Sequence, residues 1–135
     1  VHYRDTEEFI EDYYPVEIKG EVSITAVVSA NGFLPRTYTK SATISGVYKK
    51  VKSSITFSIS TNIKPPYTVK WKILNRGDEA KARDCIRGQI ITSGVERKEP
   101  LTFLGNHYVE CYIIQDEIVI ARDRFYVYIE ENLDK

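Results

Sequence analysis

Basic side chains are concentrated in one short stretch of the sequence, NRGDEAKARDCIRG, at residues 75–88. Its cations are Arg76, Lys81, Arg83 and Arg87. The planar guanidinium group of arginine matches two phosphate oxygens at once, so this stretch could hold a phosphodiester. The acidic residues Asp78, Glu79 and Asp84 are interleaved with the cations. They could instead neutralise the cluster as an ordinary solvated loop, and the sequence leaves both interpretations open.

A second polar group surrounds a turn at Gly105-Asn106. It consists of Glu99, His107 and Glu110. Such side chains near a hairpin tip could read the edge of a nucleotide base, or they could cap turns. We favour a structural, hydrogen-bonding role for His107.

Nucleophilic and metal chemistry find little support in the sequence. The histidines are His2 at the terminus and His107, and Cys111 follows His107 by four positions. On a strand this separation is about 13 Å, too far for a nucleophile and its base. The sequence lacks CxxC and HxxxH spacings and the glycine-rich loops that cradle phosphates. We therefore expect no catalytic residue, no metal and no cofactor.

The length of the chain indicates one domain, and its balanced charges indicate no strong overall electrostatic field. The chain has 135 residues, with 19 basic and 19 acidic side chains. An anion site must therefore be a local patch. No apolar run is long enough to span a bilayer, and no signal peptide is evident. We expect a cytoplasmic protein with reduced cysteines and no membrane partner.

The first residues are expected to connect this domain to another one. The chain contains no methionine and begins at Val1, which indicates a domain excised from a longer polypeptide. The stretch DTEEFIEDYYP has a capping acid at Asp5, further acids in the first turn and Pro15 as a stop, which predicts a short helix. We assign residues 1–15 to a linker helix and 16–135 to the main domain.

The rest of the chain shows the alternation of β-strands. Apolar residues repeat with period two, and turn residues or charges separate the runs. Seven or eight short antiparallel strands predict an all-β, immunoglobulin-like sandwich. We expect a turn or short helix at 78–84. The predicted strands cover residues 16–28, 55–59, 67–73, 86–92, 101–104, 108–115, 118–122 and 125–129.

Two strands show which faces are buried. Trp71 shares a face with Val69 and Ile73, which predicts a core position, whereas Lys70 and Lys72 fall on the solvent face. On the last strand the tyrosines Tyr126 and Tyr128 alternate with apolar residues and should point outward. Exposed tyrosines suit interfaces, so a protein-binding surface is the alternative to a ligand site.

The order of motifs resembles one known family. The stretches PPYTVKWKILNRGDEAKARDCIRGQI and ERKEPLTFLGNHYVECYIIQDEIVIARDRFYVYI closely resemble the AGS-C domain. This is the C-terminal sensor of adenylyl/guanylyl cyclases and SMODS-type nucleotidyltransferases in bacterial cyclic-oligonucleotide antiphage systems. The resemblance runs from about Phe9 to Ile129. It implies a non-catalytic regulatory domain, with a nucleotidyltransferase domain in the same polypeptide and a nucleotide or nucleic-acid ligand.

The resemblance also selects residues. Its polar positions with least structural need are Arg87, Glu99, His107 and Glu110. With Arg76 and Arg83 from the basic stretch they form the predicted ligand site. In the alternative, the domain recognises a phage protein or associates with itself.

Overall fold

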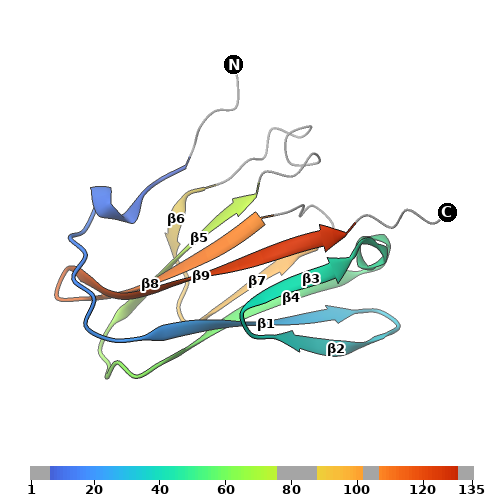
Figure 1. Cartoon of the computed structure of the whole chain (residues 1–135), viewed down its shortest axis with the longest axis horizontal. Coiled ribbons are helices and arrows are strands. Elements are labelled where there is room, and N and C mark those ends of the chain that lie inside the picture. Colours follow the sequence, from blue (N-terminus) through green and yellow to red (C-terminus); the bar gives the residue numbers. More distant parts are fainter. Residues whose placement is uncertain (1–6, 76–87, 102–106, 131–135) are drawn as a thin grey trace, which may run out of the picture.

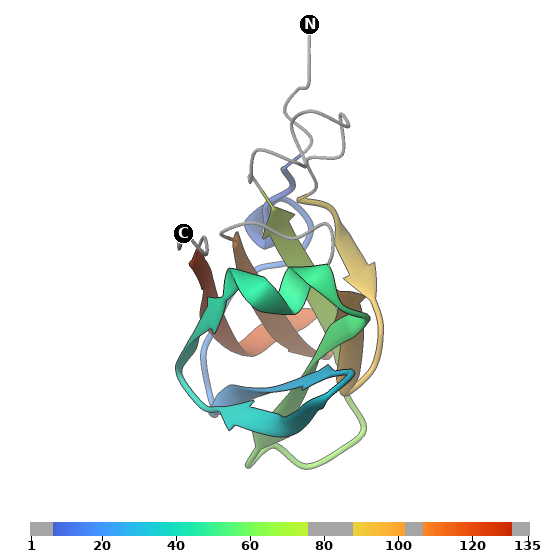
Figure 2. The same ribbon diagram turned by 90° about the vertical axis from the view of Figure 1, so that its right-hand side faces the viewer.

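A computed structural model describes residues 7–75, 88–101 and 107–130 of the chain. These residues form two β-sheets facing each other (Figures 1 and 2). The four-stranded sheet has the order β2-β1-β4-β7, and the five-stranded sheet has the order β3-β9-β8-β5-β6. The strands are β1 (Val22–Ala30), β2 (Phe33–Tyr38), β3 (Ser41–Ser45), β4 (Ser53–Thr61), β5 (Thr68–Asn75), β6 (Ile90–Thr92), β7 (Glu96–Pro100), β8 (His107–Gln115) and β9 (Ile118–Glu130).

The predicted all-β class is confirmed, and so is the presence of two sheets. Neighbouring strands are antiparallel, with one exception: β3 runs parallel to β9. The expectation of a purely antiparallel fold is therefore wrong. Among the described residues, no helix is long and apolar enough to cross a membrane.

One core fills the space between the sheets, and period-two alternation explains its composition. On β1 the buried residues alternate with more exposed ones, as pleating requires. Trp71 on β5 is fully buried, and its Nε1 donates a hydrogen bond of 2.7 Å to the carbonyl oxygen of Gly94. The predicted core position of Trp71 is confirmed.

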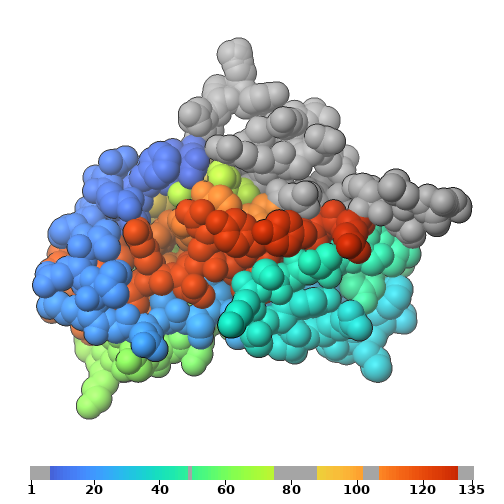
Figure 3. Space-filling view, in the orientation of Figure 1, coloured from blue at the N-terminus to red at the C-terminus, as the bar shows by residue number. Residues whose placement is uncertain are grey.

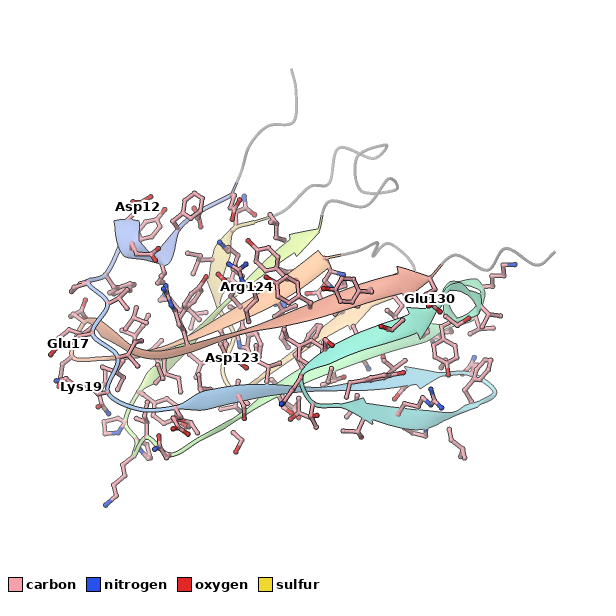
Figure 4. All side chains as sticks on the ribbon, in the orientation of Figure 1. Asp12, Glu17, Lys19, Asp123, Arg124 and Glu130 are labelled. Atoms are coloured by element: carbon pink, nitrogen blue, oxygen red, sulfur yellow. The ribbon has the colours of Figure 1, made fainter. Side chains whose placement is uncertain are left out.

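Several strand boundaries differ from the predictions. Residues 118–122 and 125–129 belong to one long strand, β9, although charged residues lie in its middle. Asp123 accepts the backbone N–H of Ile24 on β1 at 3.0 Å, whereas Arg124 lies on the opposite side of β9 (Figure 4). Each charge has its own partner, so the strand continues.

The edge strands were the hardest to predict. The edge strands β2 and β3 show no long apolar alternation, and β7 precedes the strand expected at 101–104. Leu101 lies just beyond β7, and the residues that follow it lie outside the described ones, as does the turn or helix expected at 78–84. Of the strand expected at 86–92, the structure describes β6. The strand expected at 16–28 begins only at Val22, and Val16 forms an isolated bridge with Val119.

The predicted N-terminal helix is wrong for the described residues. A single 3₁₀ turn, η1 (Ile10–Asp12), stands in its place, and Phe9 before it is extended. The backbone N–H of Glu8 donates to the carbonyl oxygen of Gly88 at 2.8 Å instead of entering a helix. Residues 7–14, called here the N-terminal segment, therefore lie on the outer face of the five-stranded sheet.

Apolar packing holds this segment in place. Ile10 is buried with Tyr112, Ile114 and Val119 in a second, smaller apolar cluster. The space-filling view shows the segment lying against β8 and β9 (Figure 3). The outer face of the five-stranded sheet is thus partly covered and partly open.

Candidate functional site on the outer face of the five-stranded sheet

Three charged residues form a row across the outer face. Lys72 on β5, Glu110 on β8 and Arg124 on β9 are consecutive cross-strand partners. Side chains of cross-strand partners lie side by side on one face of a sheet. The row therefore alternates positive, negative and positive charge beneath and beside the N-terminal segment.

Lys72 is buried, although the alternation predicts that it faces solvent. It is 2 % exposed because the N-terminal segment covers it. Its Nζ lies 3.0 Å from Oε2 of Glu7 and 3.5 Å from Oε1 of Glu110. It also donates a 3.0 Å hydrogen bond to the carbonyl oxygen of Glu8. Burying an ammonium group is costly unless carboxylates and hydrogen bonds compensate it, and here they do.

Glu110 connects the row to two tyrosines. It accepts hydrogen bonds from Nε of Arg124 at 2.6 Å and from the hydroxyl of Tyr112. The guanidinium carbon of Arg124 lies 4.1 Å from the ring centre of Tyr108, a cation–π geometry. The hydroxyl of Tyr108 donates to Oε2 of Glu7 at 3.0 Å. Burial, and then this bond to a carboxylate, raise the pKa of Tyr108 to about 12.

A cavity of about 400 Å³ lies between the N-terminal segment and the sheet. The three basic residues that line it, Lys72, Arg122 and Arg124, each have a carboxylate partner. For example, Nη1 of Arg122 lies 2.9 Å from Oε2 of Glu11. An anionic ligand would therefore compete with carboxylates for these cations. The lining residues are Glu7, Phe9, Ile10, Glu11, Lys72, Glu110, Tyr112, Arg122, Asp123 and Arg124.

Beyond the cavity the outer face carries three tyrosine rings. Tyr126 and Tyr128 on β9 are 41 % and 47 % exposed, which confirms their predicted outward orientation. Their rings are nearly parallel, with centroids 6.2 Å apart. The ring of Tyr108 on β8 lies edge-on to Tyr126, with a centroid distance of 5.9 Å. We call Tyr108, Tyr126 and Tyr128 the tyrosine stripe.

The structure separates the predicted site residues. On β8, His107 and Glu110 are an odd number of positions apart, so His107 faces the core and Glu110 faces outward. Glu99 on β7 is also buried, and its Oε2 accepts a 2.8 Å bond from Nε of Arg97. Glu99 and His107 both lie at the end of the fold where the chain passes from β7 to β8. Arg76, Arg83 and Arg87 lie outside the described residues.

The predicted ligand site did not include Lys72, Tyr108 or Arg124, although Lys72 was recognised as a cation beside the basic stretch. The available signal was that outward positions of three strands carry Lys, Glu and Arg. That signal becomes readable only when the strand register is known. Among the described residues, no group of three His, Cys, Asp or Glu side chains could hold a metal ion. Cys111 is buried, and this burial, with nearby Asp123, raises its pKa to about 12.

Comparisons with known proteins give one match. Neither the curated proteins nor the solved structures compared with the chain match it. The model of one family, described as the Adenylyl/Guanylyl and SMODS C-terminal sensor domain, matches residues 4–130. A sensor description implies a non-catalytic role. Because the match covers nearly all of the sequence, the chain belongs to the family of Adenylyl/Guanylyl and SMODS C-terminal sensor domains.

Proposed function

We propose that the chain senses a nucleotide or nucleic-acid ligand and regulates a nucleotide second-messenger synthase in bacterial antiphage defence. The family gives the sensor role and the association with cyclase and SMODS nucleotidyltransferases. The ligand class, the defence context and a cytoplasmic location are parts of the proposal. So is the regulatory route, which runs through the N-terminal segment to a nucleotidyltransferase domain in the same polypeptide.

The docking of the N-terminal segment is the observation that carries this proposal. Glu7 pairs with buried Lys72, and a carboxylate oxygen of Glu8 accepts the backbone N–H of Ile90 at 2.7 Å. Together with the packing of Ile10, these polar contacts hold the segment at the rim of a cavity, outside the strands of the sheet. A ligand that binds the docked and the undocked segment with different affinity can shift the equilibrium between them.

The charge pattern supports an anionic group on the ligand. Phosphate oxygens can replace the carboxylate oxygens of Glu7 at Lys72 and of Glu11 at Arg122, because ammonium and guanidinium groups form charge-assisted hydrogen bonds with both kinds of oxygen. Such an exchange would release the acids of the N-terminal segment. The predicted contributions of Arg76, Arg83 and Arg87 stay predictions, and the proposal does not depend on them.

Ligand-dependent thermal stability tests the binding part of the proposal. The protein is heated with cyclic dinucleotides, cyclic trinucleotides and short single-stranded oligonucleotides. A ligand at one hundred times its dissociation constant stabilises the folded state by about 2.7 kcal/mol. For a domain of this size, the midpoint should rise by several degrees. No shift with any member of the panel would overturn the proposed ligand class.

Exposed tyrosines favour a second candidate function. Tyr126 and Tyr128 could form an interface with a phage protein or a second copy of this chain, because tyrosine suits interfaces. Analytical ultracentrifugation of the wild type and of the double substitution Tyr126→Ser, Tyr128→Ser tests self-association. A dimer lost in the double variant would support self-association, and a monomer in both would exclude it.

A further inference from the structure

We infer that the tyrosine stripe, together with Arg124, binds single-stranded nucleic acid by stacking of its bases. This inference rests on the proposed sensing function and names both its binding surface and its ligand class. The cavity under the N-terminal segment adjoins the stripe and shares Arg124 with it. Lys72 and Arg122 in the cavity are paired with acids of the segment, whereas Tyr126 and Tyr128 of the stripe present exposed rings.

The tyrosine rings are arranged as a surface on which bases can stack. Tyr126 and Tyr128 are two positions apart on β9, so both point outward and their rings differ in orientation by only 10°. Tyr108 extends the aromatic surface onto β8, directly opposite Tyr126 in the strand register. Paired strands hold these rings in place. Aromatic rings on a sheet are platforms for successive bases of a single strand, and every base has a face that can stack.

Arg124 supplies the charge that such a ligand needs. Its side chain is 42 % exposed, and Nη1 donates a 3.1 Å hydrogen bond to the hydroxyl of Tyr126. Glu110 fixes the other side of the guanidinium group. A phosphate beside a base stacked on Tyr126 would therefore meet a cation that is already oriented. Lys72, the next cation in the row, is buried and cannot serve in the same way.

The border of the stripe favours a nucleic acid over a protein. The cross-strand partners of Tyr126 and Tyr128 on β3 are Ser41 and Thr43, which are small, polar and exposed. They leave the rings accessible but add little apolar area. A stable protein interface buries about 800 Å² per partner around an apolar centre, and this border offers no such centre. A duplex is excluded because its bases already stack on one another.

Direct binding tests the inference. Fluorescence anisotropy is measured with a labelled ten-nucleotide oligoadenylate, as RNA and as DNA. The double variant Tyr126→Ser, Tyr128→Ser should bind about 25-fold more weakly than wild type, or about fivefold for each ring. Tyr128→Phe keeps the ring and leaves the hydrogen bond between Arg124 and Tyr126 intact, so it should bind like wild type. The variant Phe33→Ser removes an exposed ring on the other sheet and serves as the matched control.

Salt dependence and competition give independent readouts. One phosphate contact at Arg124 should contribute about −0.7 to the slope of log K against log salt, the value for a single strand. Unlabelled single strand should compete, and a duplex of equal length should not. Equal competition by the duplex would overturn the inference.

The outcomes also separate this inference from the proposed function. Wild-type binding that survives in the double serine variant would overturn the stripe as the site, while the sensing function would stand. If no oligonucleotide binds but a cyclic nucleotide stabilises the fold, the stripe is likewise overturned as a binding site and the sensing function stands. No binding together with a dimer that depends on Tyr126 and Tyr128 would assign the stripe to self-association.

Discussion

The ammonium group of Lys72 lies between the carboxylates of Glu7 and Glu110 and the carbonyl oxygen of Glu8. In water, such pairs contribute little to stability. When one partner is buried, its removal leaves uncompensated charges behind and is strongly destabilising. Lys72 therefore determines whether the N-terminal segment can stay docked.

Substitution of Lys72 tests this role. Lys72→Met keeps most of the side-chain volume but removes the charge, so Glu7 and Glu110 lose a partner. We expect the free energy of unfolding, measured by urea denaturation, to fall by about 3 kcal/mol. Lys70→Met is the matched control: Lys70 lies on the same face of β5, and its Nζ hydrogen-bonds Thr92 in an exposed position. Its effect should stay within about 0.5 kcal/mol.

Equal losses for the two variants would contradict this role of Lys72. This role would also be contradicted if Lys72→Met lowers the free energy of unfolding but leaves the N-terminal segment as protected from hydrogen exchange as in wild type. Hydrogen exchange of the Glu8 amide, which donates to Gly88, reports that protection.

Because its thiol is buried, Cys111 makes the free energy of unfolding fall as the pH rises above about 9. Burial and nearby Asp123 raise its pKa to about 12, against a reference value of 9.0. Between these values the unfolded chain releases a proton that the folded chain keeps. The stabilisation is complete below pH 9 and is lost as pH rises toward 12. Between pH 8 and pH 10 we expect a loss of about 1.4 kcal/mol.

Urea unfolding at pH 8 and pH 10 measures this effect. Cys85→Ser is compared with the double variant Cys85→Ser, Cys111→Ala, so that Cys85 cannot contribute. Only the change between the two pH values is compared, so the cavity left by alanine cancels. The double variant should lose about 1.4 kcal/mol less than Cys85→Ser. An identical pH dependence would show that the Cys111 thiol titrates alike in both states.

At the scale of elements, the alternation of apolar and polar residues predicted which side chains point into the core and which point outward. It placed Trp71 in the core and Tyr126 and Tyr128 outside, because side-chain direction alternates along any strand. It could not place Lys72, since the covering segment comes from far away in the sequence. His107 and Glu110 are three positions apart on β8, so the same alternation places them on opposite faces. The prediction that they form one site around a turn did not take this into account.

The N-terminal segment shows how tertiary contacts override local signals. Its acids and its i,i+4 apolar pairs favour a helix. The same acids instead bind Lys72, the amide of Ile90 and Arg122 on the sheet. A short isolated helix is marginal in water, so contacts with the sheet decide its conformation. The sequence contained the residues of this site but not their register.

Gly88 allows the close approach of this segment. A Cβ atom added there would lie 2.7 Å from Cα of Glu7 and 3.1 Å from Cδ1 of Leu74. Gly88→Ala should therefore push the N-terminal segment from the sheet. We expect the Glu8 amide to exchange at least about tenfold faster, a change of about 1.4 kcal/mol. The adjacent exposed residue provides the control Gln89→Ala, which should leave this exchange unchanged.

Amides in the β1–β4 pairing provide an internal reference for that experiment. They should keep their protection in Gly88→Ala, because those strands lie in the other sheet. Unchanged exchange at Glu8 would mean that Gly88 does not control docking. A general loss of protection would instead mean that the substitution disturbs the whole fold.

At the scale of the whole molecule, contacts run from the tyrosine stripe to the N-terminal segment. Tyr126 touches Arg124, Arg124 binds Glu110, Glu110 binds Lys72, and Lys72 binds Glu7. A phosphate bound at Arg124 competes with Glu110 for the positive charge of the guanidinium group, so Glu110 interacts more strongly with Lys72 and weakens the contact between Lys72 and Glu7. Ligand binding and docking of the segment should therefore oppose each other.

Thermodynamic linkage makes this coupling testable in both directions. If an oligonucleotide weakens docking by some factor, undocking must strengthen oligonucleotide binding by the same factor, typically about 5- to 150-fold. Because Gly88→Ala raises the undocked population, anisotropy should show that it binds the ten-nucleotide oligoadenylate more tightly than wild type or Gln89→Ala, by at most this coupling factor. Exchange of the Glu8 amide in wild type should accelerate when the oligonucleotide is added. Equal or weaker binding by Gly88→Ala would contradict coupling in this direction, because a ligand that releases the segment cannot prefer the docked state.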